Sequence, residues 1–164
     1  IDHNAWLSRR QHPTRPDFLL FDLDPSDDAD FADALKVALL VRDALALMGL
    51  RCHAKTSSAR GVHVMAPIAP EHEFTDARDL CKVVARALES AHPGLVTTTW
   101  AKEQRHGVLV DCNQVGYGRT ISSVYSPLAL VLKLSSLIRP LMMSLRFSSS
   151  SSSPSSISID ADFA

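Results

Sequence analysis

Two aspartates at the end of an apolar run have the clearest potential for chemistry. Asp22 and Asp24 follow Phe18-Leu19-Leu20-Phe21, a run between Pro16 and Pro25 that is typical of a buried strand. Because side chains alternate along a strand, both carboxylates should point to the same side. Such carboxylates repel unless a cation or proton neutralises them, and Mg²⁺ and Mn²⁺ accept oxygen ligands. The pattern predicts a divalent metal site; solvated or helix-capping aspartates are the plainer alternative.

A second apolar run also ends in an aspartate. Val108-Leu109-Val110 precedes Asp111. If this strand is a neighbour of the first, three carboxylates meet at one sheet edge. That is the arrangement needed by a two-metal site for phosphoryl or nucleotidyl transfer. Taken alone, Asp111 fits equally well as a strand-end residue that caps a turn.

A turn of small residues lies between these two runs. Ser57-Ser58-Ala59-Arg60-Gly61 connects two short apolar or mixed segments, and His63 begins the second. Small residues let backbone N–H groups approach an anion, and Ser57, Arg60 and His63 add side-chain donors suited to phosphate oxygens. The turn therefore predicts a phosphate-binding loop; a plain β-turn with an exposed arginine is the alternative.

Basic residues flank the third aspartate. Lys102, Arg105 and Arg119 lie on either side of Asp111 in the chain. Cations around an acidic metal site are expected where a polyphosphate and a metal bind together. The alternative is a solvated charged surface.

The periodicity of the chain predicts two helices and several strands. An α+β fold is expected, with helices packed on a mixed or antiparallel sheet. Residues 1–17 are expected to form a loop or an edge segment, and Thr75 is a plausible N-cap. The expected strands are 18–23, 51–55, 62–66, 96–99 and 108–111, and the expected helices are 29–48 and 75–91.

Composition limits the class of protein. The 164 residues suffice for one domain, and a net charge of −1 offers no global basic field, so any phosphate-binding surface must be local. The three cysteines are far apart, which argues against a disulfide framework or a zinc knuckle and favours a reducing cytoplasm. The start at Ile1 shows no signal-peptide pattern and suggests a fragment of a longer chain.

The character of the sequence changes near residue 127. Residues 128–147 are apolar but contain Lys133, Arg139 and Pro140, so a membrane span is not expected. A serine-rich stretch follows and should be disordered. We therefore expect a catalytic core over residues 1–126 and a divergent tail over residues 127–164.

The order of these motifs resembles a known family. Residues 21–25, Lys55-Thr56-Ser57 with Gly61-Val62-His63, and residues 108–111 with Gln114 are similar to motifs of the polymerase domain of bacterial ATP-dependent DNA ligase D. They also resemble stand-alone primase-polymerases of the archaeo-eukaryotic primase superfamily. The resemblance covers about residues 1–126 and indicates a partial domain.

This resemblance implies a primase-type core on an RRM-like sheet. It implies metal-dependent, template-directed nucleotidyl transfer at DNA ends, during double-strand-break repair by end joining. By analogy, Mg²⁺ or Mn²⁺ ions are held by Asp22, Asp24 and Asp111, and the nucleoside triphosphate is bound by Ser57, Arg60, His63, His3, Gln114 and Arg105. Implied partners are primer-template DNA ends, ribonucleoside or deoxyribonucleoside triphosphates, a ligase module and a Ku-type end-binding protein.

Several departures from the family pattern suggest impaired activity. Arg60 stands where the family usually has lysine, and Val115 replaces the usual asparagine. A substantial N-terminal part and the arginine-bearing strand after Ser126 are also missing. One alternative is therefore a degenerate fragment that binds nucleotide or DNA ends without chemistry.

A second alternative is a phosphatase of the haloacid dehalogenase type, whose first aspartate is a nucleophile. That family continues with glycine and threonine after its DxD motif, whereas this chain has Pro25-Ser26. It also needs a later lysine and an acidic pair, and neither stands out here.

Overall fold

A five-stranded mixed sheet forms the centre of the fold. The computed structural model describes residues 4–57 and 60–123. The strand order is β3-β4-β2-β6-β5; β5 runs parallel to β6, and the other neighbours are antiparallel. The strands span Phe18–Pro25 (β2), His53–Thr56 (β3), Val62–Pro67 (β4), Val96–Thr97 (β5) and Val108–Asp111 (β6). This arrangement confirms the expected mixed sheet.

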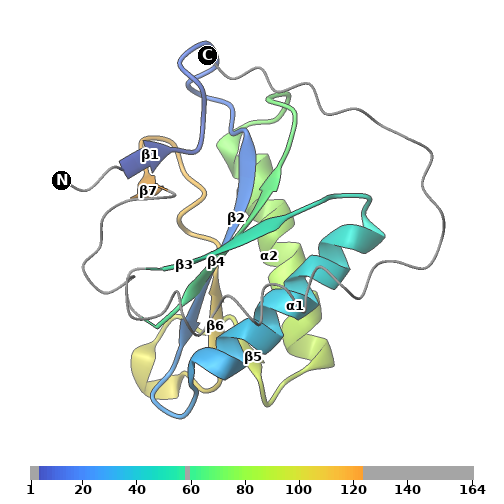
Figure 1. Cartoon of the computed structure of the whole chain (residues 1–164), viewed down its shortest axis with the longest axis vertical. Coiled ribbons are helices and arrows are strands. Elements are labelled where there is room, and N and C mark those ends of the chain that lie inside the picture. Colours follow the sequence, from blue (N-terminus) through green and yellow to red (C-terminus); the bar gives the residue numbers. More distant parts are fainter. Residues whose placement is uncertain (1–3, 58–59, 124–164) are drawn as a thin grey trace. The chain divides into compact units, whose positions relative to one another are not determined.

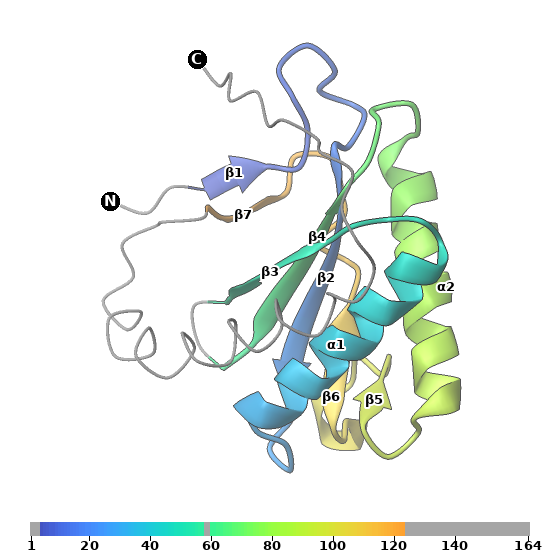
Figure 2. The same cartoon turned by 45° about the vertical axis from the view of Figure 1, so that its right-hand side comes forward.

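Two helices cover one face of this sheet. Figures 1 and 2 show α1 (Phe31–Leu47) and α2 (Phe74–Ala91) on the same side of the strands. The alternate β2 residues Leu19, Phe21 and Leu23 are fully buried and form part of the core with both helices. Asp22 and Asp24 occupy the intervening positions and therefore belong to the opposite face. The observed α+β fold confirms the predicted fold class.

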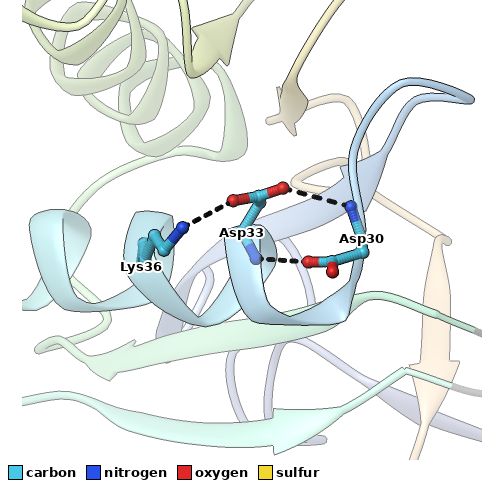
Figure 3. A network of polar contacts seen from close by, with 3 residues as sticks. All are labelled: Asp30, Asp33 and Lys36. Atoms are coloured by element: carbon cyan, nitrogen blue, oxygen red, sulfur yellow. Dashed lines mark hydrogen bonds and ion pairs between the residues drawn. The ribbon is translucent and has the colours of Figure 1, made fainter.

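A reciprocal cap fixes the start of α1 (Figure 3). The Asp33 N–H donates to Asp30 Oδ1 at 3.0 Å, and the Asp30 N–H donates to Asp33 Oδ2 at 3.3 Å. Lys36 Nζ donates to the other Asp33 oxygen at 2.9 Å. These bonds satisfy backbone donors that have no partner within the helix, and they place acidic charge at the positive end of the helix dipole. The start of α1 is therefore held by side chains of its own first turn.

We expect Asp30→Ala to lower the free energy of unfolding by about 1 kcal/mol, because an N–H of the first helical turn loses its acceptor. Urea denaturation monitored by circular dichroism measures this loss. Asp30→Asn keeps an oxygen acceptor and should lose much less. Equal losses in the two variants would contradict the capping role.

The element boundaries differ from the predictions at several points. The second helix begins at Phe74 with Glu73 as N-cap, because Asp76 accepts the Glu73 N–H at 3.2 Å; Thr75 is not the cap. Residues 4–6, expected as a loop or edge segment, form strand β1 (Asn4–Trp6), which pairs with β7 (Thr120–Ser122) in a separate two-stranded sheet. The predicted strand 96–99 ends at Thr97.

Two further predictions concern the tail and a membrane span. The divergent tail predicted over residues 127–164, with its serine-rich stretch, lies outside the described residues. Neither α1 nor α2, the two α-helices in the described part of the chain, is long and apolar enough to cross a membrane.

Candidate active site

Four polar residues form one row across the sheet. In the strand register, Lys55 is paired with His63, and His63 with Asp22. Asp22 is paired on its other side with Asp111. Directly paired residues of antiparallel strands project to the same face, so the row runs from a cation through an imidazole to two carboxylates. Strands β2 and β6 are thus neighbours, and their aspartates lie side by side on the face of the sheet opposite the helices.

The third carboxylate lies two residues along the same strand. Burial raises the pKa of Asp24 above its usual range, and the charges of Asp22 and Asp111 raise it further. Burial also raises the pKa of Asp111, against the hydrogen bond that the Asn113 N–H donates to its Oδ1 at 2.7 Å. Like charges in a partly desolvated position explain both directions. The cluster therefore has an electrostatic requirement for a cation or a proton.

His63 reaches Asp22 without completing its hydrogen-bonding needs. His63 Nε2 lies 3.2 Å from Asp22 Oδ1, and both side chains are largely buried. The contact lacks hydrogen-bond geometry, so Asp22 Oδ1 is buried without a hydrogen-bond partner within the described ranges. The other ring nitrogen, His63 Nδ1, is also buried there without a partner. An unsatisfied buried polar atom is costly, which is consistent with a ligand binding at this position.

The small-residue turn closes tightly against β2. The Ser57 N–H donates to the Gly61 carbonyl at 2.9 Å, and the Gly61 N–H donates to Ser57 Oγ at 3.1 Å. A Cβ at Gly61 would lie 2.5 Å from the Leu23 carbonyl oxygen, 2.7 Å from Ser57 Oγ and 3.0 Å from Asp24 Oδ1. Glycine is therefore required for the turn to bring Ser57 beside Asp24.

A pocket of about 640 Å³ connects this turn with the basic loop before β6. Its lining includes Asp24, Arg60, Lys102 and Arg105. Arg60 lies 3.8 Å from Asp27, and both side chains are mostly exposed, so this ion pair contributes little. The charge of Arg105 partly offsets the rise in the pKa of Asp24 that burial causes. The pocket has the size of a nucleotide site, with cations beside the carboxylates.

Two predicted site residues are not brought into this cluster by an observed contact. Gln114 lies in the turn after β6 and is half-buried. Its side chain makes no hydrogen bond to another residue in the part of the chain that the structure describes. His3 lies outside the described residues.

The structure adds Lys55 to the candidate site. Burial lowers the pKa of its ammonium group, and the Asp22 carboxylate opposes that shift. The sequence contained a signal for this residue, because the hairpin register around the turn places Lys55 opposite His63. In the sequence, Lys55 stands out only as part of the motif Lys55-Thr56-Ser57, to which no role of its own is attached.

The chemistry of the donor set fits a hard divalent cation. Asp22, Asp24 and Asp111 supply only oxygen ligands, as Mg²⁺ and Mn²⁺ prefer, and Asp22 Oδ1 is a buried acceptor without a donor. Over residues 4–57 and 60–123, no group of three or more His, Cys, Asp or Glu side chains is already gathered as a metal-ligand cluster. The metal assignment therefore remains a prediction.

Comparison with known proteins identifies the family. Residues 1–130 match the family model described as "LigD, primase-polymerase domain". The chain belongs to this family, and its primase-type α+β fold agrees with that membership. Membership leaves the phosphatase interpretation of the DxD motif without support.

Curated relatives are end-joining proteins of several bacteria. The chain is 40% identical over 109 residues to a multifunctional non-homologous end joining DNA repair protein LigD from Mycobacterium tuberculosis; the alignment covers 66% of the chain and 14% of that protein. It is 31% identical over 114 residues to the bifunctional LigD of Bacillus subtilis, covering 68% of the chain and 19% of the relative. The chain thus spans less than a fifth of these relatives.

A solved structure shows the same fold. The polymerase domain of Mycobacterium tuberculosis ligase D in complex with DNA superposes with a TM-score of 0.64 at 39% identity. The match covers 68% of this chain and 39% of the solved one. The similarity therefore extends over most of the described residues and over less than half of the solved domain.

Proposed function

We propose that this chain carries out metal-dependent, template-directed nucleotidyl transfer at DNA ends during end-joining repair. The observation that supports it best is the strand register, which pairs Asp22 with Asp111 on the face of the sheet opposite the helices. Asp24 and the Ser57–Gly61 turn adjoin them. A carboxylate cluster next to a phosphate-binding turn is what addition of a nucleoside triphosphate to a primer requires.

Each residue has a role in this proposal. Asp22, Asp24 and Asp111 would hold two Mg²⁺ or Mn²⁺ ions, which when bound supply positive charge at the attacking and leaving oxygens. Ser57, Arg60 and His63 bind the triphosphate through a hydroxyl, a guanidinium and an imidazole. Lys55 offsets part of the negative charge of the row. We assign nucleotide contacts to three further residues: Arg105, Gln114 and His3.

The proposed partners follow from the family. The solved neighbour is a polymerase domain in complex with DNA, and the relatives are end-joining proteins. We therefore propose primer-template DNA ends and ribonucleoside or deoxyribonucleoside triphosphates as substrates. A ligase module, a Ku-type end-binding protein and a cytoplasmic location complete the proposal.

Primer extension with Mn²⁺ tests this function. A labelled primer on a template with a single-stranded 5′ overhang should gain nucleotides complementary to that overhang. The aligned region is only 39% of the solved domain, and a misplacement of about 1 Å can cost on the order of 100-fold in rate. We therefore expect slow extension by the 164-residue chain. Template-independent release of inorganic phosphate, or no incorporation together with no Mn²⁺-dependent nucleotide binding, would contradict the proposal.

Arg60 allows a test of the triphosphate grip. Arg60→Ala should weaken binding of a labelled nucleoside triphosphate by about tenfold or more, because a charge-assisted contact contributes roughly 1.5–3 kcal/mol when made. Arg60→Lys keeps the charge but loses the planar fork, so its loss should be smaller. Fluorescence titration in Mn²⁺ measures both. Arg42, paired with Asp43 on α1, provides the control Arg42→Ala. Equal losses in the Arg60 and Arg42 alanine variants would contradict the assignment.

A further inference from the structure

A second pocket, separate from the one beside the Ser57–Gly61 turn, lies between α2 and the edge of β6. It measures about 170 Å³, and its lining includes Lys82, Arg86, Trp100, Asp111 and Asn113. Asp111 therefore belongs to the carboxylate cluster and also lines this pocket. Any ligand bound here lies next to the proposed reaction site.

The pocket exists because strand β5 stops early. Glu89 of α2 accepts the Thr98 N–H and the Thr98 hydroxyl, each at 2.7 Å. These bonds replace the next step of the parallel ladder, so β5 pairs with β6 over Val96 and Thr97. Beyond Thr97 the chain lies along α2. In the described part of the chain, the edge of β6 near Asp111 therefore has no neighbouring strand, and Trp100 lines the pocket.

Trp100 is an exposed aromatic ring held in place. It is 63% exposed, although tryptophan is among the largest apolar side chains. The Arg105 guanidinium lies 5.8 Å from its ring centroid and donates a hydrogen bond to its carbonyl at 2.8 Å. A ring fixed at its backbone and against a cation is a suitable platform on which a nucleic-acid base can stack.

The same pocket carries positive charge on α2. Lys82 and Arg86 are four residues apart and therefore share one helix face. Lys82 is paired with Asp79 at 3.2 Å on a largely exposed surface. Arg86 has no carboxylate within 4.0 Å among the residues that the structure describes. Its guanidinium is thus available for a phosphate.

We propose that this pocket binds one nucleotide unit of a single-stranded nucleic acid. The base stacks on Trp100, and Arg86, assisted by Lys82, contacts the phosphate, so that the strand passes beside Asp111. The role of this strand as a reaction substrate rests on the function proposed above. Its binding does not, because neither the ring nor the guanidinium needs a metal.

Tryptophan fluorescence gives a direct test with the full chain. The sequence contains two tryptophans, Trp6 and Trp100, so Trp6→Phe leaves Trp100 as the only tryptophan reporter. Titration with a deoxythymidine oligonucleotide at low salt in EDTA should quench its emission. In a fluorescein-anisotropy assay, Trp100→Ala should weaken binding by about tenfold, since stacking on an aromatic side chain contributes roughly 1–3 kcal/mol per base. Trp100→Phe should recover part of that loss.

The phosphate contact has its own readout. Arg86→Ala should lower the slope of log affinity against log salt by about 0.7, the value for one contact to a single strand. Arg51→Ala, an exposed arginine outside this pocket, should change the slope less. Circular dichroism of each variant establishes that it is folded.

Three results would overturn the proposal: no quenching of Trp100, equal affinity of Trp100→Ala and wild type, or an unchanged salt slope in Arg86→Ala. Because these titrations contain no metal and no triphosphate, their failure is separate from failure of nucleotidyl transfer. Primer extension measures the latter alone.

Discussion

Asp22→Ala should abolish Mn²⁺-dependent nucleotide binding and leave the fold intact. Asp22 is the residue of the central strand that is paired with both His63 and Asp111. Loss of a residue that only orients a metal ligand typically costs 10–100-fold in affinity, so loss of a ligand should exceed about 100-fold. Calorimetric titration with Mn²⁺ and a non-hydrolysable triphosphate measures the effect. Asp43→Ala, on the surface of α1, should bind normally.

The same variant has a predictable effect on stability. Burial and then the Asp22 charge raise the pKa of Asp24. An acid whose pKa is raised by folding destabilises the native state at pH values above that pKa. Removing Asp22 relieves part of this repulsion, so the free energy of unfolding at neutral pH should be unchanged or higher.

Wild type should gain stability as the pH falls toward the native pKa of Asp24, and Asp22→Ala should gain less. Urea denaturation between pH 5 and pH 8 checks both points. Normal Mn²⁺ affinity in Asp22→Ala, or a variant that is unfolded at neutral pH, would contradict this assignment.

Gly61→Ala should damage both the fold and the site. Its Cβ would lie 2.5 Å from the Leu23 carbonyl oxygen, which belongs to the backbone of the central strand. The backbone must therefore shift, and overpacking of this kind costs about 1–3 kcal/mol. The same shift moves Ser57 and Asp24 apart, and about 1 Å of displacement can cost on the order of 100-fold in rate. Nucleotide binding should fall with stability.

Gly94→Ala is the matched control for this variant. A Cβ at Gly94 meets no atom within 4 Å, and its φ is not in the left-handed region. Its free energy of unfolding should stay within about 0.5 kcal/mol of wild type, as for most surface changes. Thermal denaturation compares the stability of the two variants, and triphosphate titration compares their nucleotide binding. Equal behaviour of Gly61→Ala and Gly94→Ala would show that the turn does not need a glycine at position 61.

Local patterns in the sequence were sufficient to predict the main elements. Alternation along β2 indicated that Asp22 and Asp24 share a face, and the apolar run before Asp111 indicated a strand. The turn chemistry around Gly61 predicted the hairpin that the structure contains. These features depend on neighbours within a few residues, which a single sequence displays.

Features set by distant contacts were not predictable in the same way. The register that pairs Asp22 with Asp111 joins residues 89 positions apart in the sequence. The early end of β5 depends on two hydrogen bonds to a glutamate on α2. Strands β1 and β7 have three residues each, too short to show alternation. The exposure of Trp100 follows from the end of β5, so the pocket beside it was also missed.

Paramagnetic broadening by Mn²⁺ tests the central claim most directly, since a bound ion broadens the amide signals of nearby residues. In an ¹⁵N-labelled chain, substoichiometric Mn²⁺ should broaden the signals of Asp22, Asp24 and Asp111 first. Asp30 and Asp33 at the start of α1 form a second acidic pair and serve as the internal control. Broadening that begins at Asp30 and Asp33, or that spreads evenly over all exposed carboxylates, would contradict a metal site on the sheet face opposite the helices.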